Sequence, residues 1–222
     1  VPAARISLYV ATIAALSLVV RSIVFRPLSL GVAIAVFTAY VALVLCGVFF
    51  LRLGMFVDVL WRGPKEARGV ALTFDDGPNL ATTPSIVQTL RNEGVPATFF
   101  MLGYKLETPE TRALALEIHA DPLFEVANHS YSHARFTTLT VEQMRSEIAL
   151  TNQNLRIALD DACHHPRFFR IPYSASSCAS AGVVREYGLS MVGFHVDTLD
   201  WCYAIGSGTC SPAYVSWLPP QY

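Results

Sequence analysis

The sequence predicts an α/β domain, built on a parallel sheet or barrel, that follows one or two membrane-spanning helices. Three observations support this prediction. An uncharged apolar stretch near the N-terminus is long enough to cross a bilayer. After it, short runs rich in β-branched and aromatic residues alternate with segments of helical spacing, as in parallel strands joined by helices. Polar residues follow several of these runs, at the strand ends where such folds gather their functional groups.

The apolar N-terminal part predicts a membrane anchor over residues 1–52. Residues 28–51 carry no charge and exceed the roughly 20 residues that a spanning helix needs. Residues 6–25 form a second possible span, interrupted by Arg21, whose long side chain can reach the membrane interface. A signal peptide is the alternative for that first segment, but no A-x-A-like cleavage site follows it and a second span comes almost at once.

The charges beside the spans bear on their orientation. If both segments span, the short link with Arg21 and Arg26 is the natural cytoplasmic loop, and the chain after Leu51 then lies in the periplasm or outside the cell. Four basic residues favour the opposite orientation: Arg52, Arg62, Lys65 and Arg68.

Composition narrows the class of partner. The chain is 53% hydrophobic, and its first 51 residues hold only three charges, so much of the apolar excess lies in the anchor. Residues 52–222 hold the other 13 basic side chains against 17 acidic ones, a formal charge of −4. An acidic balance of this kind indicates no nucleic-acid surface.

The even number of cysteines in the polar part is consistent with an oxidising compartment but does not determine which of them would form disulfides. Cys46 lies in the second span, whereas Cys163, Cys178, Cys202 and Cys210 lie in the polar part. Four cysteines allow three pairings, of which Cys202 with Cys210 would close a short loop. Unpaired buried thiols are the alternative for Cys163 and Cys178. The "CHHP" stretch that begins at Cys163 is expected to form a loop or turn, since it lacks the ligand spacing of a zinc knuckle.

The elements of the domain follow in order after a predicted linker over residues 53–68. "GVALTF", residues 69–74, reads as a buried strand. Residues 83–93 have helical spacing, with Pro84 suited to the first turn and Gly94 to the C-cap. A helix over 140–159 is expected to open at Thr140. The remaining predicted strands are 97–102, 123–127, 167–172 and 189–196, and the remaining predicted helices are 108–119 and 179–187.

Polar residues at four strand ends are expected to meet on one rim of the sheet. Asp75 and Asp76 follow the first strand and "NHSYSH", residues 128–133, follows the third. Arg170 ends the fourth strand, and residues 197–201 follow the fifth. Taken singly, such residues have ordinary explanations: a carboxylate that caps a helix, a chance pair of histidines, a surface arginine in an ion pair, or a core tryptophan.

Together, the strand-end residues favour a catalytic metal site. The imidazoles of His129 and His133 with one carboxylate make three protein ligands, which leaves positions open for water and substrate. Adjacent residues of an extended chain point to opposite sides, so Asp75 and Asp76 need not share one task. One can bind the cation while the other acts on the attacking water. A nearby cation also offsets the repulsion between the two carboxylates.

These motifs resemble the polysaccharide deacetylases of the NodB-homology type, carbohydrate esterase family 4. The resemblance covers about residues 70–201. It rests on five stretches: "TFDDGP", "ATFFMLG", "HSYSH", "RIPY" and "DTLDW". It implies that residues 69–222 form a NodB-type domain, a distorted and incomplete (β/α) barrel.

The resemblance also assigns roles to the rim residues. It implies that Asp75 is the general base and that one divalent ion, most plausibly zinc, is bound by a set of three ligands: Asp76, His129 and His133. Four further residues take supporting roles by the same resemblance. Arg170 would orient Asp75, and the backbone near Tyr173 would help to hold the oxyanion. Trp201 would wall the sugar groove, and Asp200 would tune a histidine general acid.

The implied reaction is metal-dependent hydrolysis of N-acetyl groups on an amino-sugar polymer or oligomer. Two alternatives stay open: an O-acetyl esterase with the same site, and a membrane-anchored carbohydrate-binding pseudoenzyme without the general acid. A glycosidase is disfavoured, because adjacent aspartates cannot readily flank a glycosidic bond at the required separation.

The chain departs from the family pattern at several points. Ala127, Ser174 and Phe194 stand where the family commonly has glycine, glycine and tryptophan. The family's last motif, Leu-x-His, supplies the general acid and does not occur between Trp201 and Tyr222. The first residue, Val1, is not a methionine either. We therefore expect a fragment that is cut at both ends, with the deacetylase domain truncated at its C-terminus.

Overall fold

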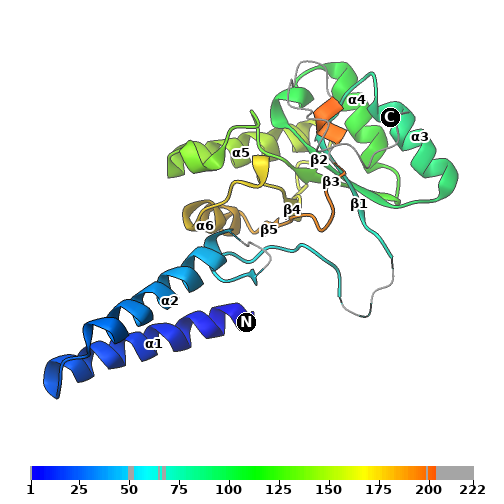
Figure 1. Cartoon of the computed structure of the whole chain (residues 1–222). Helices are drawn as coiled ribbons and strands as arrows, with labels where there is room; N and C mark the ends of the chain where they lie inside the picture. The colour runs from blue at the N-terminus through cyan, green and yellow to red at the C-terminus, as the bar shows by residue number, and fades with distance from the viewer. Residues whose placement is uncertain (1, 50–52, 65, 67–68, 199, 204–222) are drawn as a thin grey trace.

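The chain folds as a helical hairpin that projects from an α/β domain (Figure 1). The computed structural model describes residues 2–49, 53–64, 66, 69–198 and 200–203. The hairpin consists of α1 (Ala3–Val24) and α2 (Leu30–Phe49), at the positions of the two predicted spans. Both helices are long and apolar enough to cross a membrane by length and composition, and α1 buries none of its residues. Such exposed apolar helices indicate secretion or membrane anchoring.

The segment that follows the hairpin packs into the domain. Val57 is buried in the domain core, and Leu60 forms a parallel bridge with Val192. Asp58 accepts a 2.7 Å hydrogen bond from the guanidinium of Arg5, which lies in the first turn of α1. The first residues of the expected linker therefore connect the hairpin to the sheet.

The sheet is parallel throughout, as predicted, and its strands follow the order β1-β2-β3-β4-β5. Because parallel crossovers are right-handed, this sequential order places the connecting helices on one face, as in a (β/α) barrel. The strand bounds are β1 Leu72–Gly77, β2 Ala97–Met101, β3 Phe124–Asn128, β4 Phe168–Phe169 and β5 Ser190–Met191.

The helices of the domain begin and end where their capping residues predict. Gly94 ends the first of them in the left-handed conformation, with φ of 63°, which glycine adopts without strain. Thr140 and Gln143 form a capping box at the start of the longest. The helix bounds are α3 Thr83–Glu93, α4 Pro109–His119, α5 Val141–Ala158 and α6 Cys178–Glu186.

Three strands differ from the prediction. β1 continues through both aspartates to Gly77, and it is an edge strand whose Leu72 is 37% exposed, not a buried one. β4 and β5 are only two residues long. Pairing of β4 stops before Pro172, which has no N–H to donate, and Tyr173 takes a left-handed backbone with φ of 58°.

Two hydrophobic clusters make the core, and α5 joins them. Leu155 packs in one cluster with residues of α3, α4 and the first three strands, such as Met101 and Ile118. Ile148 packs in the other with Phe169 and residues of α6. Both α5 residues are fully buried, so this helix is held firmly against the strands that carry the site.

Gly103, two residues after the end of β2, provides a test of this packing. A Cβ atom there would lie 2.6 Å from the hydroxyl oxygen of Thr151 and 2.8 Å from the ring of Tyr131. We expect Gly103→Ala to lower the free energy of unfolding by about 1–3 kcal/mol, the usual cost of overpacking, as measured by urea denaturation. The matched control is Gly182→Ala in α6, where a Cβ meets nothing within 4 Å and alanine should be neutral or stabilising. A Gly103→Ala protein as stable as the parent would contradict this packing.

Candidate active site and metal centre

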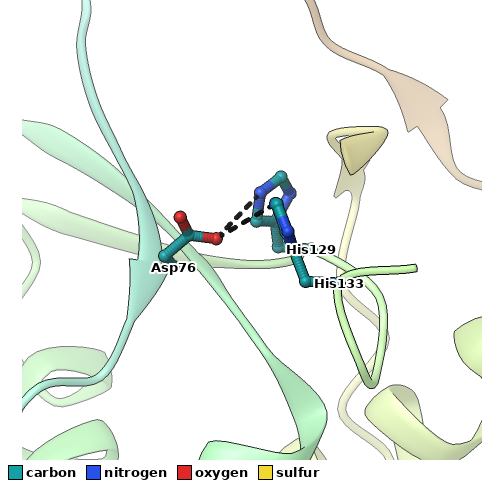
Figure 2. Close-up of side chains that lie close together, drawn as sticks. All are labelled: Asp76, His129 and His133. Atoms are coloured by element: carbon teal, nitrogen blue, oxygen red, sulfur yellow. Dashed lines mark ion pairs between the residues drawn. The ribbon is translucent and has the colours of Figure 1, made fainter. Parts of the chain in front are cut away.

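Three side chains converge at the carboxyl edge of the sheet: Asp76 from β1, and His129 and His133 from the loop after β3 (Figure 2). Oδ1 of Asp76 lies 3.4 Å from Nε2 of His129 and 3.3 Å from Nε2 of His133. One potential ligand atom from each residue lies within 4.8 Å of the other two. The structure thus brings together the three residues that were predicted from the sequence to be metal ligands.

Local backbone conformation aims these side chains at one point. Asp76 has φ of 62°, so the end of β1 departs from the extended conformation that the sequence predicted for both aspartates. Ser130 and His133 also have left-handed φ values, 72° and 60°, which let five residues turn back on themselves. At the end of β1, Lys105 donates a 2.8 Å hydrogen bond to the carbonyl of Asp76 and so stabilises the left-handed conformation of that residue.

Hydrogen bonding fixes the ring orientation of His129. Its side chain is almost fully buried, and Nδ1 lies 2.8 Å from the carbonyl oxygen of Arg170. Because a carbonyl can only accept, Nδ1 carries a proton in this contact, and Nε2 is the ring nitrogen that faces Asp76. A histidine oriented in this way is typical of metal ligands.

The charge states of the cluster also suit a cation. Burial lowers the pKa of His133 and so favours its neutral imidazole, although the nearby Asp76 carboxylate opposes the shift. Burial by itself would raise the pKa of Asp76, but the hydrogen bond with His129 and the electrostatic attraction of both histidines and Lys105 lower it overall. One carboxylate and two imidazoles make a donor set that fits a divalent metal ion.

Asp75 has different partners from its neighbour. Arg170 donates a 2.7 Å hydrogen bond to Oδ1 of Asp75, whereas Oδ2 lies 3.9 Å from Nε2 of His129. Arg170 is only 5% exposed, so it is not a surface arginine. It also donates to Thr73 Oγ1 and to the carbonyl of Gly193, at 2.8 and 2.9 Å. These bonds fix the guanidinium, and with it the Asp75 carboxylate, at the edge of the cluster.

Tyr173 forms a wall beside the cluster. Its ring centroid lies 4.5 Å from that of His133, and the guanidinium of Arg135 lies 4.6 Å from the Tyr173 ring. The side chain is 58% exposed, so part of it remains accessible to a ligand.

Asp200 and Trp201 lie in the short helix η5 (Asp200–Tyr203). Asp200 accepts a hydrogen bond from Thr198, and Trp201 is 52% exposed. In the described part of the chain, no hydrogen bond or ion pair joins Asp200 to the metal-site residues.

The cysteines whose side chains the structure describes are not part of this centre. Cys163 and Cys178 are free, and both are exposed, not buried as the unpaired alternative supposed. The proposed pairing of Cys202 with Cys210 lies outside the described residues. Residues 163–166 form an irregular turn, as predicted, in which the His164 ring packs against His119. Within the described ranges, Asp76, His129 and His133 are the only group of three or more metal-binding side chains that lie close enough together to hold one ion.

Sequence reasoning missed two residues of the site. Lys105 follows β2, so the rule that functional groups gather at strand ends could have identified it. Glu147 lies in the middle of α5 and accepts hydrogen bonds from the loop of the two histidines. No sequence signal identifies it, because its helical position resembles that of any partly exposed glutamate.

Comparison with known proteins points to one family. A family model described as polysaccharide deacetylase matches residues 62–192. A peptidoglycan-N-acetylglucosamine deacetylase of Bacillus cereus is 36% identical over 141 residues, which are 63% of this chain and 48% of that protein. A chitooligosaccharide deacetylase of Bradyrhizobium is 35% identical over 136 residues, 60% of this chain and 59% of that protein. The chain thus spans about half the length of these relatives.

The fold of the domain is also similar to solved structures. A family 4 carbohydrate esterase from Streptomyces lividans, in complex with acetate, is 37% identical, with a TM-score of 0.52. The match covers 61% of this chain and 67% of that one.

Proposed function

Because the chain belongs to the polysaccharide deacetylase family, we propose that it hydrolyses N-acetyl groups on an amino-sugar polysaccharide or oligosaccharide. The observation that carries this proposal is the Asp76, His129 and His133 cluster beside a carboxylate held by a buried arginine. The names of the two relatives, deacetylases of peptidoglycan N-acetylglucosamine and of chitooligosaccharide, support the substrate class.

The three ligands are proposed to hold a zinc ion. Two imidazole nitrogens and one carboxylate oxygen, with other positions open, are typical of catalytic zinc. When bound, the cation would supply Lewis-acid polarisation of the acetyl carbonyl and charge stabilisation in the transition state. Asp76 is suited to binding it because its lowered pKa keeps it ionised.

Asp75 is proposed as the general base. It takes a proton from the attacking water, whose oxygen bonds to the acetyl carbon. The carbon–nitrogen bond then breaks, the amine of the sugar takes up a proton, and acetate leaves. Arg170 holds Asp75 through a 2.7 Å hydrogen bond and directs its other oxygen toward the cluster.

The remaining roles stay predictions. The backbone N–H near Tyr173 is proposed to donate to the oxyanion, since Tyr173 packs on a metal ligand. Trp201 as a wall of the sugar groove, and Asp200 as a residue that tunes a histidine general acid, rest on the family resemblance.

The same proposal includes the place of the protein in the cell. Residues 1–52 anchor the chain in a membrane, and residues 69–222 form the deacetylase domain, in the periplasm or at the cell surface. Two exposed apolar helices, and an even number of cysteines in the polar part, support this arrangement.

Product analysis tests the activity. We expect the zinc-loaded full chain, in detergent, to release acetate from N-acetylglucosamine oligomers and to leave one free amine for each acetate. Acetate release can be followed by a coupled enzyme assay and the amine by fluorescamine. Acetate from acetylated xylan, with no amine from the oligomers, would instead identify an O-acetyl esterase. Binding of oligomers without release of acetate would identify a carbohydrate-binding pseudoenzyme.

A further inference from the structure

The loop that carries both histidine ligands depends on hydrogen bonds from outside itself. Residues 129–133 follow β3 and form a tight loop that brings His133 back beside His129. Ser130 and His133 adopt left-handed backbone conformations, which residues other than glycine seldom adopt. A conformation of this kind persists only where the surroundings hold it. The contacts around the loop should therefore reveal what keeps the second ligand in place.

Glu147 of α5 makes three of these contacts. Its Oε2 accepts hydrogen bonds from the backbone N–H groups of Tyr131 and Ser132, at 2.9 and 2.8 Å. Its Oε1 accepts from the Ser132 hydroxyl at 2.6 Å. Both carboxylate oxygens are thus used to hold two successive residues, and Ser132 immediately precedes His133.

The position of Glu147 is itself well fixed. The next residue, Ile148, is fully buried in the core, and the carbonyl of Ile148 accepts a hydrogen bond from Asn128 at the end of β3. Glu147 is half-buried, in a helix with a capping box at its start. Charge-assisted bonds from such a rigid element are stronger than neutral ones.

The two histidines differ in how much they need this support. His129 pairs through its backbone N–H with Met101, and its ring is held by the Arg170 carbonyl. The ring of His133, within the described residues, contacts Asp76 and the rings of His129 and Tyr173, with no hydrogen bond to the backbone. Its place depends on the loop backbone.

We propose that Glu147 is a positioning residue that holds His133 in the metal-binding set. The proposal rests on the metal assignment made above. Glu147 is not one of the three side chains that could hold the cation. It fixes the backbone one and two residues before His133, so that the imidazole is already in place when the cation arrives.

Metal affinity in a double-mutant cycle tests the proposal. Glu147→Gln turns one acceptor oxygen into an N–H donor, and we expect the zinc dissociation constant to rise about 10- to 100-fold, the range usual for partners of metal ligands. In a His133→Ala background the same change should alter the constant less than about twofold, because the ligand that Glu147 positions is gone. Competition with a chromophoric chelator measures each constant. The matched control is Glu142→Gln, an exposed glutamate of the same helix, which should bind zinc like the parent.

Several outcomes would overturn the proposal. Unchanged zinc affinity in Glu147→Gln would do so, as would an equal loss of affinity in the parent and in the His133→Ala background, which would indicate general support of the fold. If Glu147→Gln does not fold, Ser132→Ala removes only the hydroxyl bond. A two- to fivefold rise in the constant is then expected, confined to the chain with His133, and no rise would contradict the proposal. These readouts concern metal alone, so a chain that binds zinc but releases no acetate would contradict the proposed function and leave this inference standing.

Discussion

Asp75→Asn is expected to lower kcat/KM for N-acetylglucosamine oligomers by about 10²- to 10⁴-fold, the usual contribution of a general base. Asparagine keeps the shape of the side chain and can still accept a hydrogen bond from Arg170, so the fold should persist. Its amide cannot take a proton from water at neutral pH. Acetate release at saturating and at limiting substrate gives kcat and kcat/KM separately.

Zinc content separates this role from metal binding. Asp75 lies outside the ligand cluster, with Oδ2 3.9 Å from Nε2 of His129, so Asp75→Asn should bind as much zinc as the parent. Asp160→Asn is a matched control, since Asp160 is exposed in the turn after α5 and asparagine tolerates its left-handed φ of 49°. A variant at Asp75 that keeps most of the activity would exclude it as the base. If the Asp75→Asn protein loses zinc as well as activity, Asp75 belongs to the metal site.

Helix ends were predictable because their causes are local. The capping box at the start of α5 joins Thr140 and Gln143, three residues apart, and Gly94 ends α3 through its own backbone freedom. Interactions of this range can be read from a short window of sequence.

Strand lengths were less predictable because distant contacts decide them. The apolar run at 167–172 predicted one continuous strand, but only Phe168 and Phe169 pair. The next residue, Arg170, turns its side chain across the site to Thr73 and Asp75, which are 97 and 95 positions away in sequence. No local pattern shows where such a strand leaves the sheet.

The candidate site also has residues that could be predicted from the sequence and residues that could not. The three proposed metal ligands stand at or near strand ends in recognisable motifs, so their proximity could be predicted from the sequence. Glu147 binds backbone N–H groups, which every residue except proline carries, and so its partners leave no mark in the sequence. The left-handed backbone at Asp76 could not be predicted from the sequence either, because aspartate adopts this conformation only where the fold requires it.

The largest effect is expected from removal of both histidine ligands. In His129→Ala with His133→Ala, one carboxylate remains of the three donors, and we expect the purified protein to hold less than about a tenth of the parent's zinc. If the cation supplies about 4 kcal/mol of transition-state stabilisation, acetate release falls by about 10³-fold or more. Metal analysis and the acetate assay on the same preparation measure both effects.

Two comparisons make this result specific to the cluster. His119→Ala with His165→Ala removes two histidines from outside the cluster, so zinc content and activity should match the parent. Added zinc should restore a chelator-treated parent but not the ligand variant, because only the parent keeps the two imidazole donors of the cluster. The melting temperature of the metal-free proteins separates loss of ligands from loss of fold, since His129 is buried and its ring holds the Arg170 carbonyl. If the ligand variant folds and retains the parent's zinc, the cation is bound elsewhere, and both the metal assignment and the proposed mechanism are wrong.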